Sequence, residues 1–392
     1  MQFPQRFSNL PDYAFPRLRA LLAGHPPGGA EIAMSIGEPQ HAFPDFVAGV
    51  LAASVAEFGK YPPNDGTTEL LSAISTWLLL RYGVVKDPET EIIALNGTRE
   101  GLFNAAIALC PETKHGKTPK VLIPNPFYQV YAVASAAVMA EPVFLSCPAT
   151  SGFLPDFATL DAAVLDQTAM VYLCSPSNPQ GAIASAEYWK RLLELAEKHD
   201  FRILADECYA EIYRDQPPPG ALEVAAKIGA DPERILVFHS LSKRSNLPGL
   251  RSGFAAGGPR TIAALKKLRT YAGAPLPLPL QRVAAAVWSD ESHVTANRAL
   301  YQQKYQIADQ VFKDVQSYMP PKAGFFLWLP VDDGETATVR LWCETGVKVL
   351  PGAYLGRDTP TGNPGHEFIR VAMVTETEEM RRGLQLIRDC IY

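Results

Sequence analysis

The sequence predicts an α/β protein with a large domain, built on a mostly parallel sheet flanked by helices, and a smaller α/β domain. Two patterns lead to this fold class. Between about residues 90 and 275, short apolar runs alternate with longer helical stretches, which is typical of crossover units in a parallel sheet. The short runs are also nearly continuous in apolar residues, as expected for strands that are covered on both faces.

Strands are expected at 91–95, 120–123, 170–174, 202–205 and 235–238, with helices between them, for example at 99–109 and Ala186–His199. A proline-rich break at 274–280 precedes one long helical stretch, about 281–317, and two short β-like segments at 324–329 and 367–374. Residues 1–45 are irregular and rich in proline and glycine. We therefore expect an N-terminal arm that is part of the small domain (1–45), a large domain (46–280) and a C-terminal small domain (281–392).

The bulk composition excludes several classes of protein. The 392 residues are 47% hydrophobic and 20% charged, which is ordinary for a globular protein. A net charge of −5 argues against nucleic-acid binding, which needs a basic surface. We find no apolar stretch of membrane-spanning length and no apolar core of a secretory signal. The six cysteines are scattered without metal-binding or disulfide spacing, so we expect a cytoplasmic protein without a metal site.

The segment around Lys243 is the most informative part of the chain. Lys243 follows an apolar run, is flanked by Ser240 and Ser242, and precedes Arg251 by eight residues. A lysine held at a strand end among hydroxyl and guanidinium donors is equipped to form an imine with an anionic aldehyde cofactor. That cofactor would be pyridoxal phosphate. Taken alone, the segment is equally compatible with a solvated basic loop.

Polar residues follow three of the expected strands, and this pattern favours the imine site. Asn178 comes after the strand at 170–174, Asp206 follows 202–205 with Tyr209 close behind, and Lys243 follows 235–238. Ligands of open α/β sheets bind beyond the carboxyl ends of the strands. Asp206 would keep the pyridine nitrogen of the cofactor protonated. Asn178 and Tyr209 would donate hydrogen bonds to the ring oxygen of the cofactor. Each has a structural alternative, since aspartate often caps helices and Asn-Pro is a common turn.

A phosphate group needs its own cradle. Gly97 and Thr98 stand between an expected strand and an expected helix, where free backbone N–H groups favour an anion. Ser240, Ser242 and Arg251 would complete the cradle, with the arginine as the main charge partner. An ordinary helix start is the alternative interpretation of the Gly-Thr pair.

Two further features complete the candidate site. Tyr128 and Tyr131 lie in a segment that begins where an expected strand ends. An aromatic ring at this position would either stack on a flat cofactor or pack in a domain interface. Arg370 lies in the β-like segment at 367–374 among apolar residues. A buried arginine must find an anion, and a two-pronged clamp on a substrate carboxylate is the functional version of that requirement.

With these residues assembled, the chain resembles the fold-type I pyridoxal-phosphate aminotransferases of class I/II. The resemblance runs nearly end to end through eight ordered motifs, at 35–39, 61–66, 96–99, 126–128, 177–181, 206–209, 240–251 and 368–370. It implies an aspartate aminotransferase-like large domain with a seven-stranded type of sheet. It also implies a homodimer with shared active sites, small amino-acid and 2-oxo-acid substrates, and no nucleic-acid or membrane partner.

The resemblance further implies a role for each matching residue. Lys243 is expected to carry the cofactor and shuttle the proton, with Asp206 and Tyr209 beside it in catalysis. The substrate is expected to contact Gly37, Asn178 and Arg370. The expected cofactor-binding residues are Gly97, Thr98, Arg99, Tyr128, Asn178, Asp206, Tyr209, Ser240, Ser242, Lys243, Arg251 and, from the neighbouring subunit, Tyr61.

Within the family, the segments at 13–19, 37–44 and 242–254 are most similar to bacterial succinyldiaminopimelate aminotransferases. The expected reaction is amino transfer between N-succinyl-LL-2,6-diaminopimelate and 2-oxoglutarate, a step of lysine biosynthesis. The alternatives are an aminotransferase for aspartate, alanine or aromatic substrates, or a carbon–sulfur β-lyase of the same fold. A pyridoxal-phosphate-sensing regulator would need an attached DNA-binding domain. Tyr128 stands where aspartate aminotransferases commonly carry a stacking tryptophan, and no arginine for a distal substrate carboxylate is recognisable.

Overall fold

The computed structural model describes residues 5–8, 10 and 13–392. Its largest sheet contains seven strands, in chain order β2 (Ile92–Leu95), β3 (Lys120–Asn125), β4 (Glu141–Ser146), β5 (Thr168–Cys174), β6 (Arg202–Asp206), β7 (Ile235–Ser240) and β8 (Gly253–Gly257). Their order across the sheet is β2-β8-β7-β6-β5-β3-β4. Only β8 is antiparallel to its neighbours, so the mostly parallel sheet expected from the sequence is confirmed.

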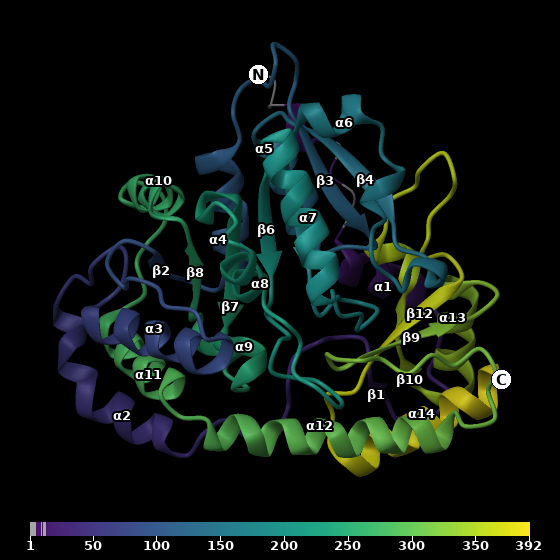
Figure 1. Ribbon diagram of the computed structural model, residues 1–392. Helices are drawn as coiled ribbons and strands as arrows, with labels where there is room; N and C mark the ends of the chain where they lie inside the picture. The colour runs from purple at the N-terminus through teal and green to yellow at the C-terminus, as the bar shows by residue number, and fades with distance from the viewer. Residues whose placement is uncertain (1–4, 9, 11–12) are drawn as a thin grey trace.

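A second group of short strands lies in the C-terminal third (Figure 1). β9 (Phe326–Pro330), β11 (Leu350–Pro351) and β12 (Phe368–Ala372) form an antiparallel sheet in the order β11-β12-β9. β1 (Ile32–Ala33), near the N-terminus, pairs with β10 (Val347–Lys348). Residues 32–33 therefore pair with a strand from the C-terminal third of the chain.

The helices lie against both sheets, as Figure 1 shows. They are α1 (Ala14–Leu22), α2 (Phe46–Ser54), α3 (Thr68–Tyr82), α4 (Thr98–Leu109), α5 (Val130–Ala137), α6 (Ala162–Gln167), α7 (Ala186–His199), α8 (Ala221–Ile228), α9 (Leu241–Arg244), α10 (Pro259–Arg269), α11 (Leu278–Trp288), α12 (Ser292–Val311), α13 (Gly334–Thr345) and α14 (Thr377–Ile391). No helix in the described ranges is both long and apolar enough to cross a membrane.

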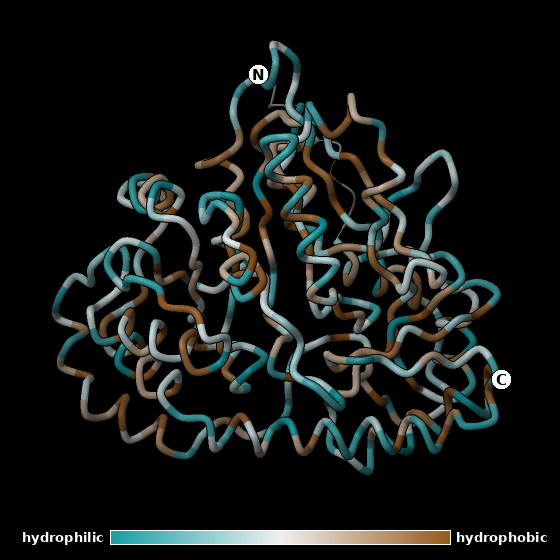
Figure 2. The backbone as a smooth tube through the Cα atoms, in the orientation of Figure 1, coloured by the Kyte–Doolittle hydropathy of each residue, from teal (hydrophilic) through white to brown (hydrophobic). Residues whose placement is uncertain are grey.

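Each strand of the large sheet contributes to two apolar layers. In β6, Ile203 and Ala205 pack with residues of α3, α7, α8 and α11. Leu204, which points to the opposite face, packs with residues of α4, α5 and α10. This double coverage explains why most of these strands are continuously apolar, and Figure 2 shows brown segments at the centre of the molecule.

The long helical stretch expected at 281–317 is in fact two helices, α11 and α12. The Asp290 carboxylate lies in the break and accepts hydrogen bonds from the His293 backbone N–H and the Ser292 hydroxyl. A carboxylate that takes backbone N–H groups in this way starts a new helix. α11 packs against α2 and α3, so we propose that the large unit continues to residue 288. Later residues of α12 join the core of the C-terminal unit.

Two strands of the large sheet were not expected from the sequence. β4 lies at the sheet edge and is partly exposed, so it lacks the continuous apolar character used to find the others. β8 contains two glycines among five residues, and glycine is depleted in strands. Neither strand carries a predicted site residue.

Candidate active site

The carboxyl ends of β5, β6 and β7 open into a cavity of about 330 Å³. These three strands are adjacent and parallel, which brings the three polar strand ends together as the sequence predicts. Residues of the smaller sheet, including Phe326 and Leu350, close the opposite wall. The predicted site residues that line the cavity are Gly37, Thr98, Arg99, Tyr128, Asn178, Asp206, Tyr209, Ser240, Ser242, Lys243, Arg251 and Arg370.

Lys243 lies on α9, a single turn that follows β7 directly. The Ser240 hydroxyl caps this turn by accepting the Ser242 backbone N–H at 3.1 Å. The Lys243 ammonium donates to the carbonyl of Gly37 and lies 5.5 Å from the centre of the Phe325 ring. Burial lowers the pKa of Lys243 to about 8. At pH 7 roughly a tenth of this lysine is therefore the neutral, nucleophilic amine, far more than for an ordinary lysine.

Asp206 is the last residue of β6 and is buried. The Tyr131 hydroxyl donates to its Oδ2 at 2.8 Å, and the Cys208 backbone N–H donates to its Oδ1 at 3.3 Å. Burial raises the pKa of Asp206, so a cation placed in the cavity beside this carboxylate would be favourable. Tyr131 also stacks on Tyr172, with 4.6 Å between the ring centroids, so it packs the core and supports Asp206 rather than lining the cavity.

Arg370 enters the cavity from β12 and is only 4% exposed. Its guanidinium donates to the Asn178 side-chain oxygen at 3.1 Å and to the Ser35 carbonyl at 2.8 Å. Its Nε has no hydrogen-bond partner in the described part of the chain. Burial lowers the pKa of Arg370 to about 10. A buried cation held only by neutral oxygens has room for an anionic ligand.

The expected phosphate cradle lies at the start of α4. Gly97 precedes the helix with φ 80° and ψ 158°, a conformation essentially restricted to glycine. A Cβ at Gly97 would lie 2.2 Å from Nη2 of Arg251, so Gly97 does not line the cavity but lets the arginine approach. Thr98 Oγ1 lies 3.1 Å from Cys208 Sγ, and the Ser240 and Ser242 hydroxyls are 2.9 Å apart. Hydroxyls, a guanidinium and a helix N-terminus in one place suit a phosphate group.

Tyr128 lines the cavity between the cradle and the Asp206 wall. The Arg99 Nε donates to its hydroxyl at 2.7 Å, and its ring lies edge-on to Tyr131. Tyr61, by contrast, is fully exposed and outside the cavity. That position leaves open the expectation that it acts on a neighbouring subunit.

Some cavity residues were not predicted from the sequence. Tyr13 lies in a segment that carried the family resemblance, and Cys208 lies between two predicted strand-end residues, so local signals existed for both. Phe326 reaches the cavity from β9, and nothing in the local sequence distinguishes it from a core aromatic. Its ring lies under Arg370, 4.2 Å from the guanidinium carbon.

Comparison with known proteins agrees with this geometry. The family model for aminotransferase class I and II matches residues 30–387. The chain belongs to the class I and II aminotransferases. Among solved structures, an aminotransferase from Neisseria meningitidis Z2491 has a TM-score of 0.94 and 38% identity, covering 100% of both chains. The aminotransferase AspB from Helicobacter pylori 26695 has a TM-score of 0.90 and 33% identity, over 97% of this chain and 98% of that one.

Curated relatives of this aminotransferase carry a narrower name. LL-diaminopimelate aminotransferase from Dehalococcoides mccartyi strain 195 is 30% identical over 98% of this chain and 97% of its own length. LL-diaminopimelate aminotransferase 2 from Trichormus variabilis is 29% identical over 99% of this chain and 98% of its own length. The predicted family and fold are thereby confirmed.

Class I and II aminotransferases depend on pyridoxal phosphate, so the predicted cofactor is confirmed at the level of the family. The cavity fits this group. It combines a lysine of lowered pKa, a buried carboxylate and a hydroxyl-rich cradle with an arginine. Arg370 also lines this cavity, and its guanidinium bonds only the neutral oxygens of Asn178 and Ser35.

Proposed function

We propose that this aminotransferase exchanges the amino group of N-succinyl-LL-2,6-diaminopimelate with 2-oxoglutarate, as a homodimer in the cytoplasm. The observation that best supports an amino-acid substrate is the presence of Lys243 and Arg370 in one cavity. The first presents an amine of lowered pKa, and the second presents a buried cation without a carboxylate partner in the described chain. Support for the diaminopimelate skeleton comes from the segments at 13–19, 37–44 and 242–254 and from the names of the relatives.

The proposed roles follow from the contacts. Bound pyridoxal phosphate supplies an electron-accepting ring that stabilises negative charge at the substrate α-carbon. Lys243 Nζ would hold the cofactor covalently and, once freed by the amino substrate, would accept the α-proton and deliver it to the cofactor. Arg370 holds the substrate α-carboxylate through charge-assisted hydrogen bonds, with Asn178 orienting the guanidinium. Gly37, whose carbonyl receives the Lys243 ammonium, lies on the substrate side.

The remaining residues position and charge the cofactor. Asp206, supported by Tyr131, would accept a hydrogen bond from the protonated ring nitrogen of the cofactor and keep that nitrogen charged. Tyr209 and Asn178 would donate to the cofactor ring oxygen. Tyr128 would lie against the cofactor ring. Thr98, Arg99, Ser240, Ser242 and Arg251, with the turn at Gly97 and the partner's Tyr61, are proposed to hold the phosphate.

A second candidate, free LL-diaminopimelate, is favoured by the names of the relatives. The two substrates differ at the end far from the reacting amine, where one carries a succinyl amide and the other an ammonium group. An assay with 2-oxoglutarate and a panel of amino donors separates them. The panel is N-succinyl-LL-diaminopimelate, LL-diaminopimelate, N-acetylornithine, aspartate and alanine.

The proposal expects the succinylated donor to give the highest kcat/KM. Faster turnover of free LL-diaminopimelate selects the second candidate, and activity confined to aspartate or alanine overturns both. Release of pyruvate and ammonia from cystathionine without a 2-oxo acid would select a β-lyase. Lys243→Ala serves as the control, because it removes the amine and must abolish the visible absorption of the purified protein.

A further inference from the structure

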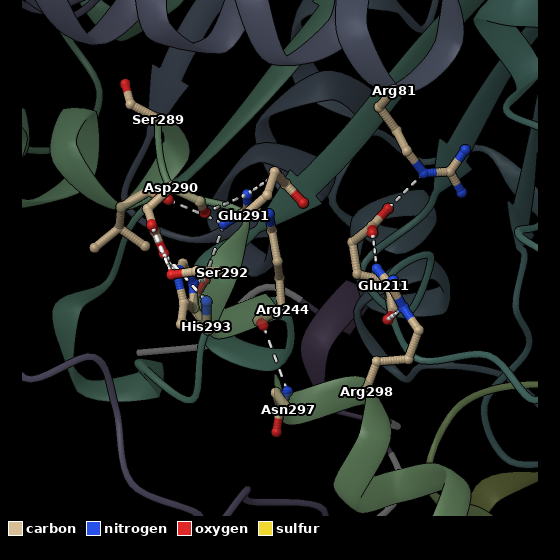
Figure 3. A network of polar contacts seen from close by, with 12 residues as sticks. Arg81, Glu211, Arg244, Ser289, Asp290, Glu291, Ser292, His293, Asn297 and Arg298 are labelled. Carbon is tan, nitrogen blue, oxygen red and sulfur yellow. Dashed lines mark hydrogen bonds and ion pairs between the residues drawn. The ribbon is translucent and has the colours of Figure 1, made fainter. Parts of the chain in front are cut away.

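Arg244 follows Lys243 directly, and the proposed chemistry does not use it. Its side chain is 3% exposed and leaves α9 away from the cavity, towards the break between α11 and α12 (Figure 3). There the guanidinium donates to the Val287 carbonyl at 3.1 Å, to the Asp290 carbonyl at 3.3 Å and to the Glu291 carboxylate. A residue next to the reactive lysine is thus bound to the junction of two long helices.

The surroundings of Arg244 favour a fixed guanidinium. The last carbonyl groups of an α-helix carry partial negative charge and lack partners within the helix, so a cation at the end of α11 is stabilised there. The Trp288 and Trp77 rings lie 4.8 Å and 5.7 Å from the guanidinium carbon. Planar indoles and several acceptors together restrict a planar guanidinium to one orientation.

The two residues after Arg244 are bound to the same region. The Ser245 hydroxyl lies 2.8 Å from His293 Nε2. The Asn246 side chain donates to the Asn297 side-chain oxygen at 3.1 Å and to the Ala42 carbonyl at 3.1 Å. The Asn297 amide in turn donates to the Arg244 carbonyl at 3.4 Å. Every residue from 244 to 246 therefore contacts the start of α12 or the junction before it.

These anchors matter because α9 has only four residues. A helix this short has no stability of its own, since forming its first turn costs more than its few hydrogen bonds return. Its orientation must come from contacts at its ends. The Ser240 cap holds the first end, and the Arg244 network holds the second.

We propose that Arg244 is a positioning residue that fixes the direction of Lys243 by locking α9 to the α11–α12 junction. This inference rests on the proposed role of Lys243 as the cofactor-bearing lysine. Without the guanidinium, α9 can rotate about its first end, and the amine then meets its reaction partners in a wider range of orientations. Chemistry at Nζ suffers, whereas substrate binding at Arg370 does not.

The test compares Arg244→Met with Arg244→Lys in the purified holoenzyme. Arg234→Met is the control, because Arg234 is likewise held by carboxylates, those of Glu197 and Asp200, but lies before the opposite end of β7. The rate at which the visible absorption band disappears is measured against the concentration of the donor that reacts fastest with wild type. The same band is titrated with pH to obtain the apparent pKa of the lysine–cofactor link.

For Arg244→Met we expect the limiting rate to fall at least about tenfold, a barrier increase of about 1.4 kcal/mol. The half-saturating concentration should change less than about threefold, and the apparent pKa should move by at least about half a pH unit. Arg244→Lys should recover part of the rate, because its ammonium still reaches the junction. Arg234→Met should match wild type in rate and titration.

Wild-type rate and titration in Arg244→Met, or the same losses in Arg234→Met, overturn the proposal. If Arg244→Met does not fold, Glu291→Gln replaces it and must shift the band titration in the same way, and an unshifted titration overturns the proposal. A wild-type protein without a visible band would instead contradict the proposed function. The two failures are therefore distinguishable.

Discussion

At the scale of single residues, the cavity holds cations that lack the partners such groups usually need. Lys243 donates to a backbone carbonyl, and Arg370 bonds only neutral oxygens. Burying an unpaired charge costs stability, and burial lowers the pKa of both residues. Elsewhere, the buried Arg269 has a carboxylate partner, Glu100 at 3.4 Å. A ligand bound in the cavity would complete these two cations.

Lys243→Met should therefore stabilise the cofactor-free protein at neutral pH. The folded-state pKa of Lys243 is about 8 against an ordinary 10.5. Between these values the unfolded chain holds a proton that the folded chain has released, so wild-type stability rises with pH and is reduced below pH 8. The Lys243→Met variant does not bear this cost, which is at most about 3.5 kcal/mol at about 1.4 kcal/mol for each pKa unit.

Denaturant unfolding of both cofactor-free proteins at pH 7 and pH 9.5 measures this difference. The advantage of Lys243→Met should shrink at the higher pH. Lys190→Met, at an exposed position, should show no such pH-dependent gain. An advantage of the same size at both pH values would contradict the lowered pKa.

Arg370→Met should lower kcat/KM for the amino donor by at least about a hundredfold, or about 2.7 kcal/mol, because it removes charge-assisted bonds to the substrate carboxylate. Thermal stability should be unchanged or higher, since an unpaired buried cation is lost. Arg340→Met, which breaks only an exposed pair with Glu344, is the control. A variant with kcat/KM within threefold of wild type would remove Arg370 from the site.

At the scale of elements, short segments at the strand ends are held by helices from distant parts of the chain. Glu211, on the segment after Tyr209, bonds Arg81 of α3 at 2.7 Å and Arg298 of α12 at 2.8 Å (Figure 3). The segment after Lys243 is bound to the start of α12. α12 therefore contacts the segments that follow β6 and β7.

The turn between β2 and α4 offers an element-scale prediction. Gly97→Ala forces a glycine-only conformation on alanine and places a Cβ against Arg251. The strained backbone should cost about 1–3 kcal/mol of stability. Displacement of the Arg251 guanidinium should weaken cofactor binding about tenfold. Gly83→Ala, at φ 66° with open space around it, carries only the backbone cost. Unfolding and cofactor titration distinguish the two variants, and equal cofactor affinity in both would exclude Arg251 from the phosphate cradle.

At the scale of the whole molecule, the cavity lies between the large sheet and the smaller one, and both supply residues to it. Lys243 and Asp206 come from the first, and Arg370 comes from the second. β1 joins the N-terminal segment to the second unit, which brings Gly37 to the same cavity. Tyr61 is the one predicted cofactor-binding residue that lies fully exposed.

A hybrid dimer tests whether Tyr61 serves the neighbouring subunit. Tyr61→Ala and Lys243→Ala chains are co-expressed with different tags, and dimers carrying both tags are purified. One site then combines wild-type Lys243 and Tyr61 from different chains, so activity should be about half that of wild type. Each parent dimer should be nearly inactive. A hybrid as inactive as its parents would show that Tyr61 acts within its own chain, whereas a fully active Tyr61→Ala parent would show that it has no role.

The local sequence determined much of this protein, because its chemistry follows the strands directly. Continuous apolar runs identified five strands of the large sheet, and polar residues immediately after three of them identified Asn178, Asp206 and Lys243. Such signals are local. A parallel strand covered on both faces is apolar throughout, and its carboxyl end opens where ligands bind.

Tertiary structure alone decided which distant residues support that site. The pairing of Tyr131 with Asp206, the reach of Phe326 beneath Arg370 and the binding of Arg244 to the α11–α12 junction join residues separated by many elements. The local sequence around a tyrosine, phenylalanine or arginine does not indicate which distant residue its side chain will contact. The break between α11 and α12 is another feature that depends on distant residues, because the Arg244 guanidinium that binds both sides of the break comes from another part of the chain.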